Sequence, residues 1–394
     1  MSKLMTPNPV YKPFSYPWAH QAWLKQNQMH WLPEEVPLAE DVKDWNVNLT
    51  PEEKNLLTQI FRFFTQQDIT VGGAYTDLYL KVFQPTEIRM MLTQFAAMET
   101  THVAAYSHLL DTIGMPEIEY SAFLNYKEMK DKFDYVQQFN VGTKHDIAKA
   151  LAVFSAFTEG LQLFASFAML MNFPRFNKMK GMGQIVAWSV RDESLHVENM
   201  IMLFRAFIEE NPHIWTDDFK KEIYDICREM VHHEDAFIDL AFEQGPVEGM
   251  SANDLKQYIR FIADRRLLQL GLKPNYDVKD NPLPWMDEIL NAPEYVNFFE
   301  QRATEYSRAA TQGTWPEAFA KKYYVYGQAN CPQCTQVKNF LDGRKEQYEY
   351  IDLTNRPEVK IEMIEKYGAK SMPIIFLEDH YVGGVWDLIE IQKP

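Results

Sequence analysis

The sequence predicts a mainly α-helical protein with a small α/β domain at its C-terminal end. Apolar residues recur at helical spacing through most of the first 310 residues, and no convincing strand pattern appears before residue 320. From residue 322 onward, short apolar runs alternate with helical segments in the order βαβαββα. At 394 residues the chain is also long for a single domain. We therefore expect a helix bundle over residues 1–310, a linker over 311–321 and the small domain over 322–394.

The composition narrows the classes of function. The chain is 46% hydrophobic and 14% aromatic, which is ample for a large core, and its net charge is −16. Nucleic-acid binding needs a basic surface, which this charge balance does not provide. Three cysteines are too few for a disulfide-stapled secreted fold, and the first residues contain no apolar signal core. The sequence predicts a soluble, cytoplasmic protein that binds neither nucleic acid nor membranes.

Helix start and stop signals divide the bundle into elements. A proline-punctuated arm and a short helix after residue 17 come first. Thr50-Pro51-Glu52-Glu53 then supplies an N-cap, a proline at the first helical position and acids near the positive end of the helix dipole. Further helices are expected from Pro85-Thr86-Glu87 to Gly114, from about Thr143 to just before Pro174, after Gly181-Met182-Gly183, and over about 216–243, 251–270 and 293–311.

The apolar run at 151–173 is long enough to span a bilayer, but it carries Glu159 in its middle. A charged residue there would be costly in lipid, whereas the centre of a large bundle requires a helix that is apolar all round. We expect a buried helix, in which Glu159 needs a partner.

In the small domain, the strand signals are the runs YYVYG, YEYIDL, IIFLE and YVGG. The last two form a hairpin, and amphipathic helices are expected up to about Leu341, over 357–367 and at the C-terminus. This order fits a mixed sheet.

Glu-x-x-His occurs four times in the chain, so the motif alone is weak evidence for a metal site. The copy at 210/213 contains a proline at a helix end, and the copy at 229/232 lies in a polar stretch typical of a solvated face. The other two copies, Glu99/His102 and Glu193/His196, lie inside apolar helices, where i and i+3 share one face.

Two further apolar helices contribute Asp68 and Glu159. Two Glu-x-x-His helices and one carboxylate from each of two others form the ligand set of ferritin-like dimetal carboxylate bundles. Four carboxylates and two imidazoles suit a pair of iron or manganese ions. Alternatively, the same groups form salt bridges in the core. Without metal, burying so many charged groups would carry a large desolvation cost. Tyr106 lies one turn beyond His102; from spacing alone it is either a residue beside the metals or an ordinary core tyrosine.

Residues 15–310 resemble the radical-generating small subunit of class I ribonucleotide reductase. The matching stretches include HWLPEEV, FTQQDITVGG, METTHVAAYSH, FTEGLQLFASF, VRDESLHVEN and NPLPWMD. The resemblance implies that one metal is held by Asp68, Glu99 and His102, and the other by Glu159, Glu193 and His196. It also implies that the oxygen-activated metal pair oxidises Tyr106 to a stable tyrosyl radical.

The same resemblance implies that Trp31 and Asp192 begin a proton-coupled electron path, and that Tyr306 hands the radical to the catalytic subunit. Asp192 also suits the acceptor of a ligand imidazole N–H. Leu163, Phe167 and Ser189 fall where family members have an apolar cage, and Ser189 is a polar departure from it.

Cys331-Pro-Gln-Cys334 lies at an expected strand-to-helix junction, where a thiol ionises readily and becomes nucleophilic. Zinc binding is the rival interpretation, but no second pair of ligands follows at a suitable spacing. Residues 322–394 resemble glutaredoxin. The resemblance implies that Cys331 attacks, that Cys334 resolves, and that glutathione lies along Met372, Pro373, Trp386 and Asp387.

Together the two resemblances imply a homodimeric oxidoreductase that supplies a radical to a separate large catalytic subunit for ribonucleotide reduction. The fused glutaredoxin would reduce the disulfide left on that subunit, and tethering would raise its local concentration. Trp315 and Phe319 in the linker form either a docking motif or part of a spacer. Three alternatives remain open: a ferritin-like oxidase or monooxygenase, a metal-storage bundle, and a disulfide oxidoreductase with an inert helical anchor.

Overall fold

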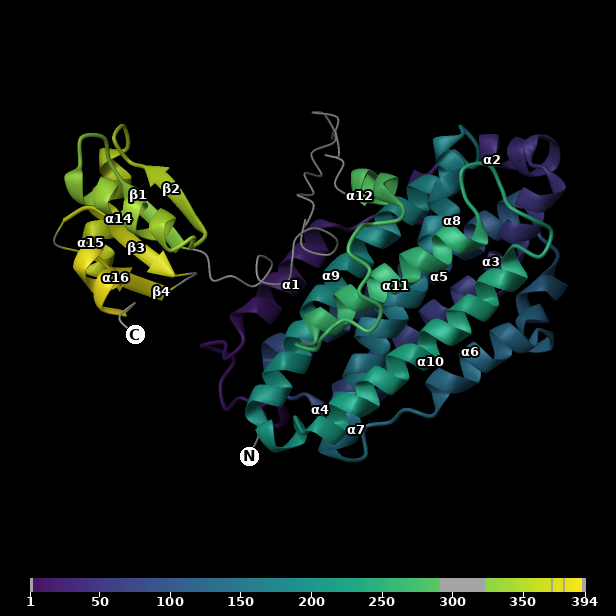
Figure 1. Cartoon of the computed structure of the whole chain (residues 1–394), viewed down its shortest axis with the longest axis horizontal. Helices are drawn as coiled ribbons and strands as arrows, with labels where there is room; N and C mark the ends of the chain where they lie inside the picture. Colours follow the sequence, from purple (N-terminus) through teal and green to yellow (C-terminus); the bar gives the residue numbers. More distant parts are fainter. Residues whose placement is uncertain (1–2, 291–322, 370, 378–379, 392–394) are drawn as a thin grey trace. The chain divides into compact units, whose positions relative to one another are not determined.

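The computed structural model describes residues 3–290, 323–369, 371–377 and 380–391. The chain forms two compact units, Met1–Gln312 and Gly313–Pro394 (Figure 1). The predicted fold class, mainly α with a small C-terminal α/β domain, is confirmed. The predicted linker at 311–321 and helix at 293–311 lie outside the described residues, so the domain boundaries stay a prediction.

The first unit is a bundle of long helices (Figure 1). Its α-helices are α1 (Pro17–Gln28), α2 (Ala39–Lys43), α3 (Pro51–Gly73), α4 (Leu80–Val82), α5 (Thr86–Ile113), α6 (Lys127–Gln137), α7 (Lys144–Leu151), α8 (Leu163–Arg175), α9 (Lys180–Glu210), α10 (Asp217–Ala241), α11 (Ala252–Gln269) and α12 (Pro284–Leu290). Within residues 3–290, three segments are wound as π-helices: η3 (Asp44–Asn48), η4 (Ala74–Tyr79) and η6 (Ala152–Gln162). In the centre, α3 packs against α5, while α9 packs against α8 and η6.

The predicted start of α3 is confirmed. The Thr50 hydroxyl accepts the Glu53 N–H at 3.2 Å, and the Glu53 carboxylate accepts the Thr50 N–H at 2.9 Å. This reciprocal capping box satisfies two backbone donors that the helix itself cannot pair. Thr143 caps α7 in the same way.

Two predicted boundaries around α8 and α9 are wrong. Helix α8 runs to Arg175 and includes Pro174 in its last turn, so the helix loses the one hydrogen bond that this residue would donate but does not have to continue beyond it. Helix α9 begins at Lys180, so Gly181 lies inside it. Its first N–H groups are paired by a distant side chain, because the Asp41 carboxylate accepts the N–H groups of Gly181 and Met182 at 2.9 and 2.8 Å. A side chain at Gly181 would collide with Asp41.

The long apolar run is buried, as predicted. Residues 144–175 pass the length and hydropathy test for a membrane-crossing helix, but their most apolar window is completely buried within the unit. The run comprises α7, η6 and α8, and its π-helical centre carries Glu159.

The second unit contains a four-stranded mixed sheet in the order β2-β1-β3-β4. Its elements are β1 (Tyr323–Gly327), α14 (Pro332–Gly343), β2 (Tyr348–Asp352), α15 (Pro357–Tyr367), β3 (Ile374–Leu377), β4 (His380–Gly383) and α16 (Val385–Ile391), in the predicted βαβαββα order. Strand β1 pairs parallel with β2 and antiparallel with β3. Alternate residues of the central strands enter separate apolar clusters on the two faces.

Candidate metal centre

Four helical segments bring the six predicted ligands into the centre of the bundle. Helix α3 supplies Asp68, η6 supplies Glu159, and helices α5 and α9 each supply one Glu-x-x-His pair. All six side chains are buried. One ligand atom from each of Glu99, Glu159, Glu193 and His196 lies within 4.8 Å of the others, so these four residues form a compact set.

His102 lies next to this set and, like His196, directs its Nδ1 atom toward the two central glutamates. The Nδ1 atom of His102 lies 3.2 Å from a Glu193 oxygen and 3.4 Å from a Glu99 oxygen. The Nδ1 atom of His196 lies 3.0 Å from the other Glu99 oxygen and 3.6 Å from the other Glu193 oxygen. Each of the two central glutamates therefore faces both imidazoles.

Most of the inward-facing atoms form no hydrogen bond, although several lie within ion-pair distance of one another. Among the described residues, those without a hydrogen-bond partner include the Nδ1 atoms of both histidines, both oxygens of Glu99 and Glu193, and one oxygen of Asp68. Buried polar groups are almost always hydrogen-bonded, so a cluster of such atoms requires another partner. Carboxylate oxygens and imidazole nitrogens are the donor set that iron and manganese accept. The residues present thus fit a dimetal centre.

Charge in the cluster is balanced by shifted protonation. Burial, and after it the charge of Glu99, raises the pKa of Asp68 well above its usual range. Burial would also raise the pKa of Glu99, but contacts with His102 and His196 lower it to about 2. Burial opposes the charge of His196, yet Glu193 and Glu99 raise its pKa to about 10. In the metal-free centre, protons on these side chains thus balance the charge that metal ions would balance, so metal binding must release the protons.

The outward-facing nitrogen of each imidazole is held by a hydrogen-bond network. One Asp192 oxygen accepts the Trp31 indole N–H at 2.8 Å and lies 3.2 Å from His102 Nε2. The Gln26 amide donates to the other Asp192 oxygen at 3.0 Å. Since the amide nitrogen faces the carboxylate, the amide oxygen faces His196 Nε2, 3.2 Å away, which must donate. Once the second proton of each imidazole is released, both histidines therefore keep a proton on Nε2 and leave Nδ1 for a metal.

Gln26 was not found by sequence reasoning. It lies on α1, is fully buried, and belongs to no motif, so nothing in its sequence neighbourhood distinguishes it from the exposed Gln28 two residues later.

Replacing Gln26 with leucine is expected to lower metal affinity about 10- to 100-fold, because partners that orient ligand imidazoles have effects of this size. The change leaves the Nε2–H of His196 without an acceptor, which should also lower the free energy of unfolding by about 1–3 kcal/mol. Metal titration and thermal melts would measure both effects. Gln28→Leu on the same helix serves as the control, and equal effects of the two substitutions would contradict this role.

A second unpredicted residue, Tyr75, lies on the Glu159 side of the centre. Its hydroxyl donates to Glu159 at 2.5 Å, and its ring meets the His196 ring edge-on. The next residue along from Glu159, Gly160, has its carbonyl held by the buried guanidinium of Arg266 at 2.6 Å. The π-helical turns η4 and η6 carry Tyr75 and Glu159, and a regular helical pattern in the sequence does not reveal such turns.

Tyr106 is fully enclosed, one turn beyond His102 on α5. The Phe64 ring packs edge-on against its ring, with centroids 4.7 Å apart, and Phe167 packs against Phe64. The Tyr106 hydroxyl donates to the Ser189 hydroxyl at 3.0 Å. Burial, and after it the charge of Asp68, raises the pKa of Tyr106. The neutral phenol is the stable form in this surrounding.

The second unit holds the two predicted redox cysteines as a disulfide, Cys331–Cys334. Cys331 is the N-cap of α14, and its sulfur accepts the Cys334 N–H at 3.1 Å. The Met372-Pro373 peptide is cis, and the Met372 carbonyl oxygen lies 3.9 Å from the Cys331 sulfur. Trp386 is two-thirds exposed. Asp387 accepts the Gly384 N–H at 2.7 Å.

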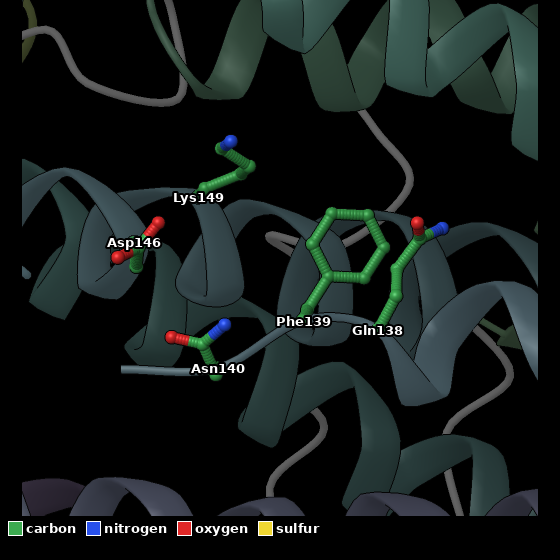
Figure 2. Close-up of a pocket in the computed structure, with 5 residues that line it drawn as sticks. All are labelled: Gln138, Phe139, Asn140, Asp146 and Lys149. Atoms are coloured by element: carbon green, nitrogen blue, oxygen red, sulfur yellow. The ribbon is translucent and has the colours of Figure 1, made fainter. Parts of the chain in front are cut away.

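Two surface hollows of the bundle do not involve the ligand residues. One, of about 160 Å³, is lined by Gln138, Phe139, Asn140, Asp146 and Lys149 between α6 and α7 (Figure 2). Another, of about 330 Å³, lies along α3 and η4 and reaches Phe154 on η6. Tyr306, predicted to pass the radical onward, lies outside the described residues.

Two family models and several known proteins match this chain. The family model described as "Ribonucleotide reductase, small chain" matches residues 9–282, and the glutaredoxin model matches residues 322–382. A protein of Invertebrate iridescent virus 3, named a probable ribonucleoside-diphosphate reductase small subunit, is 44% identical over 334 residues, covering 80% of this chain and 88% of the relative. The ribonucleoside-diphosphate reductase subunit beta of Chlamydia pneumoniae is 30% identical, covering 75% and 89%.

A solved structure shares the fold of the bundle. The ribonucleotide reductase R2 subunit from Clostridium botulinum matches with a TM-score of 0.65 and 24% identity, covering 70% of this chain and 88% of that chain. With a family model that spans most of the chain, and with relatives at 30–44% identity, the chain belongs to the ribonucleotide reductase small-chain family and carries a C-terminal glutaredoxin domain.

Proposed function

We propose that this chain generates and stores a tyrosyl radical on Tyr106 and supplies it to a separate large catalytic subunit, which reduces ribonucleotides to deoxyribonucleotides. The observation that carries the proposal is the convergence, beside a buried tyrosine, of carboxylate oxygens and two Nδ1 atoms that lack hydrogen-bond partners. The bundle is proposed to act as a homodimer in the cytoplasm.

In this proposal Asp68, Glu99 and His102 hold one metal ion, while Glu159, Glu193 and His196 hold the other. A pair of iron or manganese ions, once activated by dioxygen, supplies an oxidant strong enough to remove an electron from a phenol. The protein holds the ligands apart from water, and the network through Asp192 and Gln26 keeps both Nδ1 atoms directed inward.

With the oxidised metal pair in place, Tyr106 would lose one electron to it and would pass its phenolic proton to a nearby carboxylate. Asp68 is the carboxylate whose charge acts most strongly on this phenol. Phe64 and the other apolar neighbours keep water and small reductants away from the oxidised ring, which favours a long-lived radical.

Radical transfer is proposed to begin at Trp31. Its indole is hydrogen-bonded to Asp192, which also faces the outer nitrogen of His102, so a continuous set of contacts joins the indole to the centre. The Trp31 and His102 rings lie with centroids 6.0 Å apart. Tyr306 is proposed to receive the radical for delivery to the catalytic subunit.

The glutaredoxin domain is proposed to reduce the disulfide that turnover leaves on the catalytic subunit. The Cys331 thiolate attacks that disulfide and forms a mixed disulfide. Cys334 then displaces the substrate cysteine, which leaves a dithiol on the catalytic subunit and the Cys331–Cys334 disulfide seen here. Two glutathione molecules, bound in turn along Met372, Pro373, Trp386 and Asp387, would restore the dithiol and leave as glutathione disulfide.

Replacing Cys331 with serine is expected to abolish glutathione-dependent disulfide reduction, because a serine hydroxyl is not ionised at neutral pH. The radical on the bundle should be unaffected. A coupled NADPH assay with glutathione reductase would measure the disulfide reduction. Retention of activity in Cys331→Ser would show that another thiol is the nucleophile.

The experiment that tests the proposed function is low-temperature EPR on apoprotein loaded separately with iron and with manganese and then exposed to oxygen. A tyrosyl signal with either metal, together with ribonucleotide reduction when the large subunit is added, is the expected result. Oxygen consumption without a radical would favour an oxidase, and metal uptake without either would favour a storage bundle.

A further inference from the structure

Ser189, a polar residue beside Tyr106, has no role in the proposed function. Phe64 packs against the Tyr106 ring, and Phe167 and Leu163 are buried in the same apolar core, whereas Ser189 is buried and polar. Among the described contacts, the hydrogen bond from the Tyr106 hydroxyl to Ser189 is the one made by that hydroxyl. A buried hydroxyl is costly unless it is paired, so Ser189 needs a reason to be there.

Ser189 takes part in two hydrogen bonds. Its oxygen accepts from Tyr106 at 3.0 Å, and its own hydroxyl proton is donated to the Ile185 carbonyl, also at 3.0 Å. Ile185 and Ser189 are four residues apart within α9, so the Ile185 carbonyl also lies in the regular backbone ladder of the helix. The serine proton can therefore turn away from this carbonyl without leaving it unpaired.

Oxidation changes the Tyr106 oxygen from a hydrogen-bond donor to an acceptor, so its neighbour must change from acceptor to donor. The phenol is a donor, whereas the neutral phenoxyl radical has lost its proton and its oxygen can only accept. A side chain that could only accept, such as a carboxylate, would lose the hydrogen bond on oxidation and face the radical with a lone pair. A hydroxyl is both donor and acceptor, and it turns about a single bond.

We propose that Ser189 hydrogen-bonds Tyr106 in both oxidation states, accepting from the phenol and donating to the phenoxyl radical. This inference rests on the proposed function, because it requires the radical to form. Ser189 is a positioning residue and not the base: a serine oxygen that kept the phenolic proton would carry a positive charge in an apolar surrounding. The proton still leaves toward the carboxylates of the centre.

The inference predicts a spectroscopic signature. A hydrogen bond to the phenoxyl oxygen withdraws spin density from that atom and lowers the gx value of the radical. In protein exchanged into D2O before metal loading, the Ser189 deuteron should give a resolved coupling to the radical in high-frequency ENDOR. Ser189→Ala should raise gx and remove the coupling, and Ser189→Thr, which keeps the hydroxyl, should restore both toward the wild-type values.

Ser194→Ala is the matched control. Ser194 is buried on the same helix and donates to the carbonyl four residues earlier, that of Val190, but no hydrogen bond joins it to Tyr106 in the described residues. This variant should leave gx and the deuteron coupling unchanged. Metal content and far-UV circular dichroism of each variant would establish that it is folded and loaded.

The outcomes separate this inference from the proposed function. A wild-type radical without an exchangeable deuteron coupling would overturn the role of Ser189 and leave the proposed function standing, even if every variant failed to fold. An unchanged gx and coupling in Ser189→Ala would do the same, since another donor would then be responsible. Absence of any radical in the wild-type protein would overturn both.

Discussion

Tyr106→Phe is expected to abolish the tyrosyl EPR signal and to reduce ribonucleotide reduction with the large subunit to the background of the assay. Phenylalanine has no hydroxyl proton to lose and cannot be oxidised under these conditions, so the stored radical has no site. Metal uptake should be unchanged, because Tyr106 makes no hydrogen bond to a ligand side chain in the described residues.

The fold should tolerate this substitution. Ser189 loses one donor but still donates to Ile185, so no buried donor is left unpaired, and the free energy of unfolding should fall by only about 1 kcal/mol. EPR spin counting, metal analysis and a thermal melt on the same samples would measure all three quantities.

Tyr79→Phe is the control for Tyr106→Phe. Tyr79 is equally buried, and its hydroxyl donates to the Ala150 carbonyl at 3.0 Å. This variant should keep the radical. A signal that persists in Tyr106→Phe would contradict the assignment and direct attention to Tyr75, whose hydroxyl already contacts Glu159.

Glu193→Gln is expected to reduce bound metal from two ions per chain to one or none, and to abolish the radical as a consequence. The two Glu193 oxygens lie 3.2 Å and 3.6 Å from the Nδ1 atoms of the two histidines, so this carboxylate faces both halves of the centre. An amide keeps the shape of the side chain but loses the negative charge that a hard cation requires. Elemental analysis after loading and desalting would measure the metal content.

Thermal stability distinguishes a metal ligand from a structural ion pair. If Glu193 is a ligand, metal should stabilise the wild-type protein by about 2.7 kcal/mol at a free concentration one hundred times the dissociation constant, and Glu193→Gln should lose this gain. If Glu193 instead serves a structural salt bridge, the substitution should lower the stability of the metal-free protein by about 3–5 kcal/mol. Glu209→Gln, at an exposed position of the same helix, should change neither quantity.

The fold class was predictable because its signals are local. The Thr50 cap, the helical spacing of apolar residues and the run of short strands after residue 322 each lie within a few neighbouring positions. The two Glu-x-x-His ligand pairs were also recognisable from neighbouring positions, because they lie in apolar helices and the other two copies of the motif do not.

What the sequence did not reveal depends on contacts between distant segments. Helix α9 begins earlier than predicted because Asp41, 140 residues before Gly181, pairs its first N–H groups. Gln26 joins the centre across 166 residues to Asp192. Tyr75 points at Glu159 from a π-helical turn, a register that a regular helical pattern does not distinguish from an ordinary helix.

The Gln26 bridge makes the two halves of the centre interdependent. The Gln26 amide has its oxygen toward Nε2 of His196, which keeps the imidazole proton on that nitrogen and would leave Nδ1 for a cation. Its nitrogen consequently faces Asp192, and the other oxygen of this carboxylate is available for the Nε2–H of His102. The network is already formed without metal, so one buried amide fixes the orientation of both imidazoles, and a change at Gln26 is expected to disturb both halves of the proposed centre together.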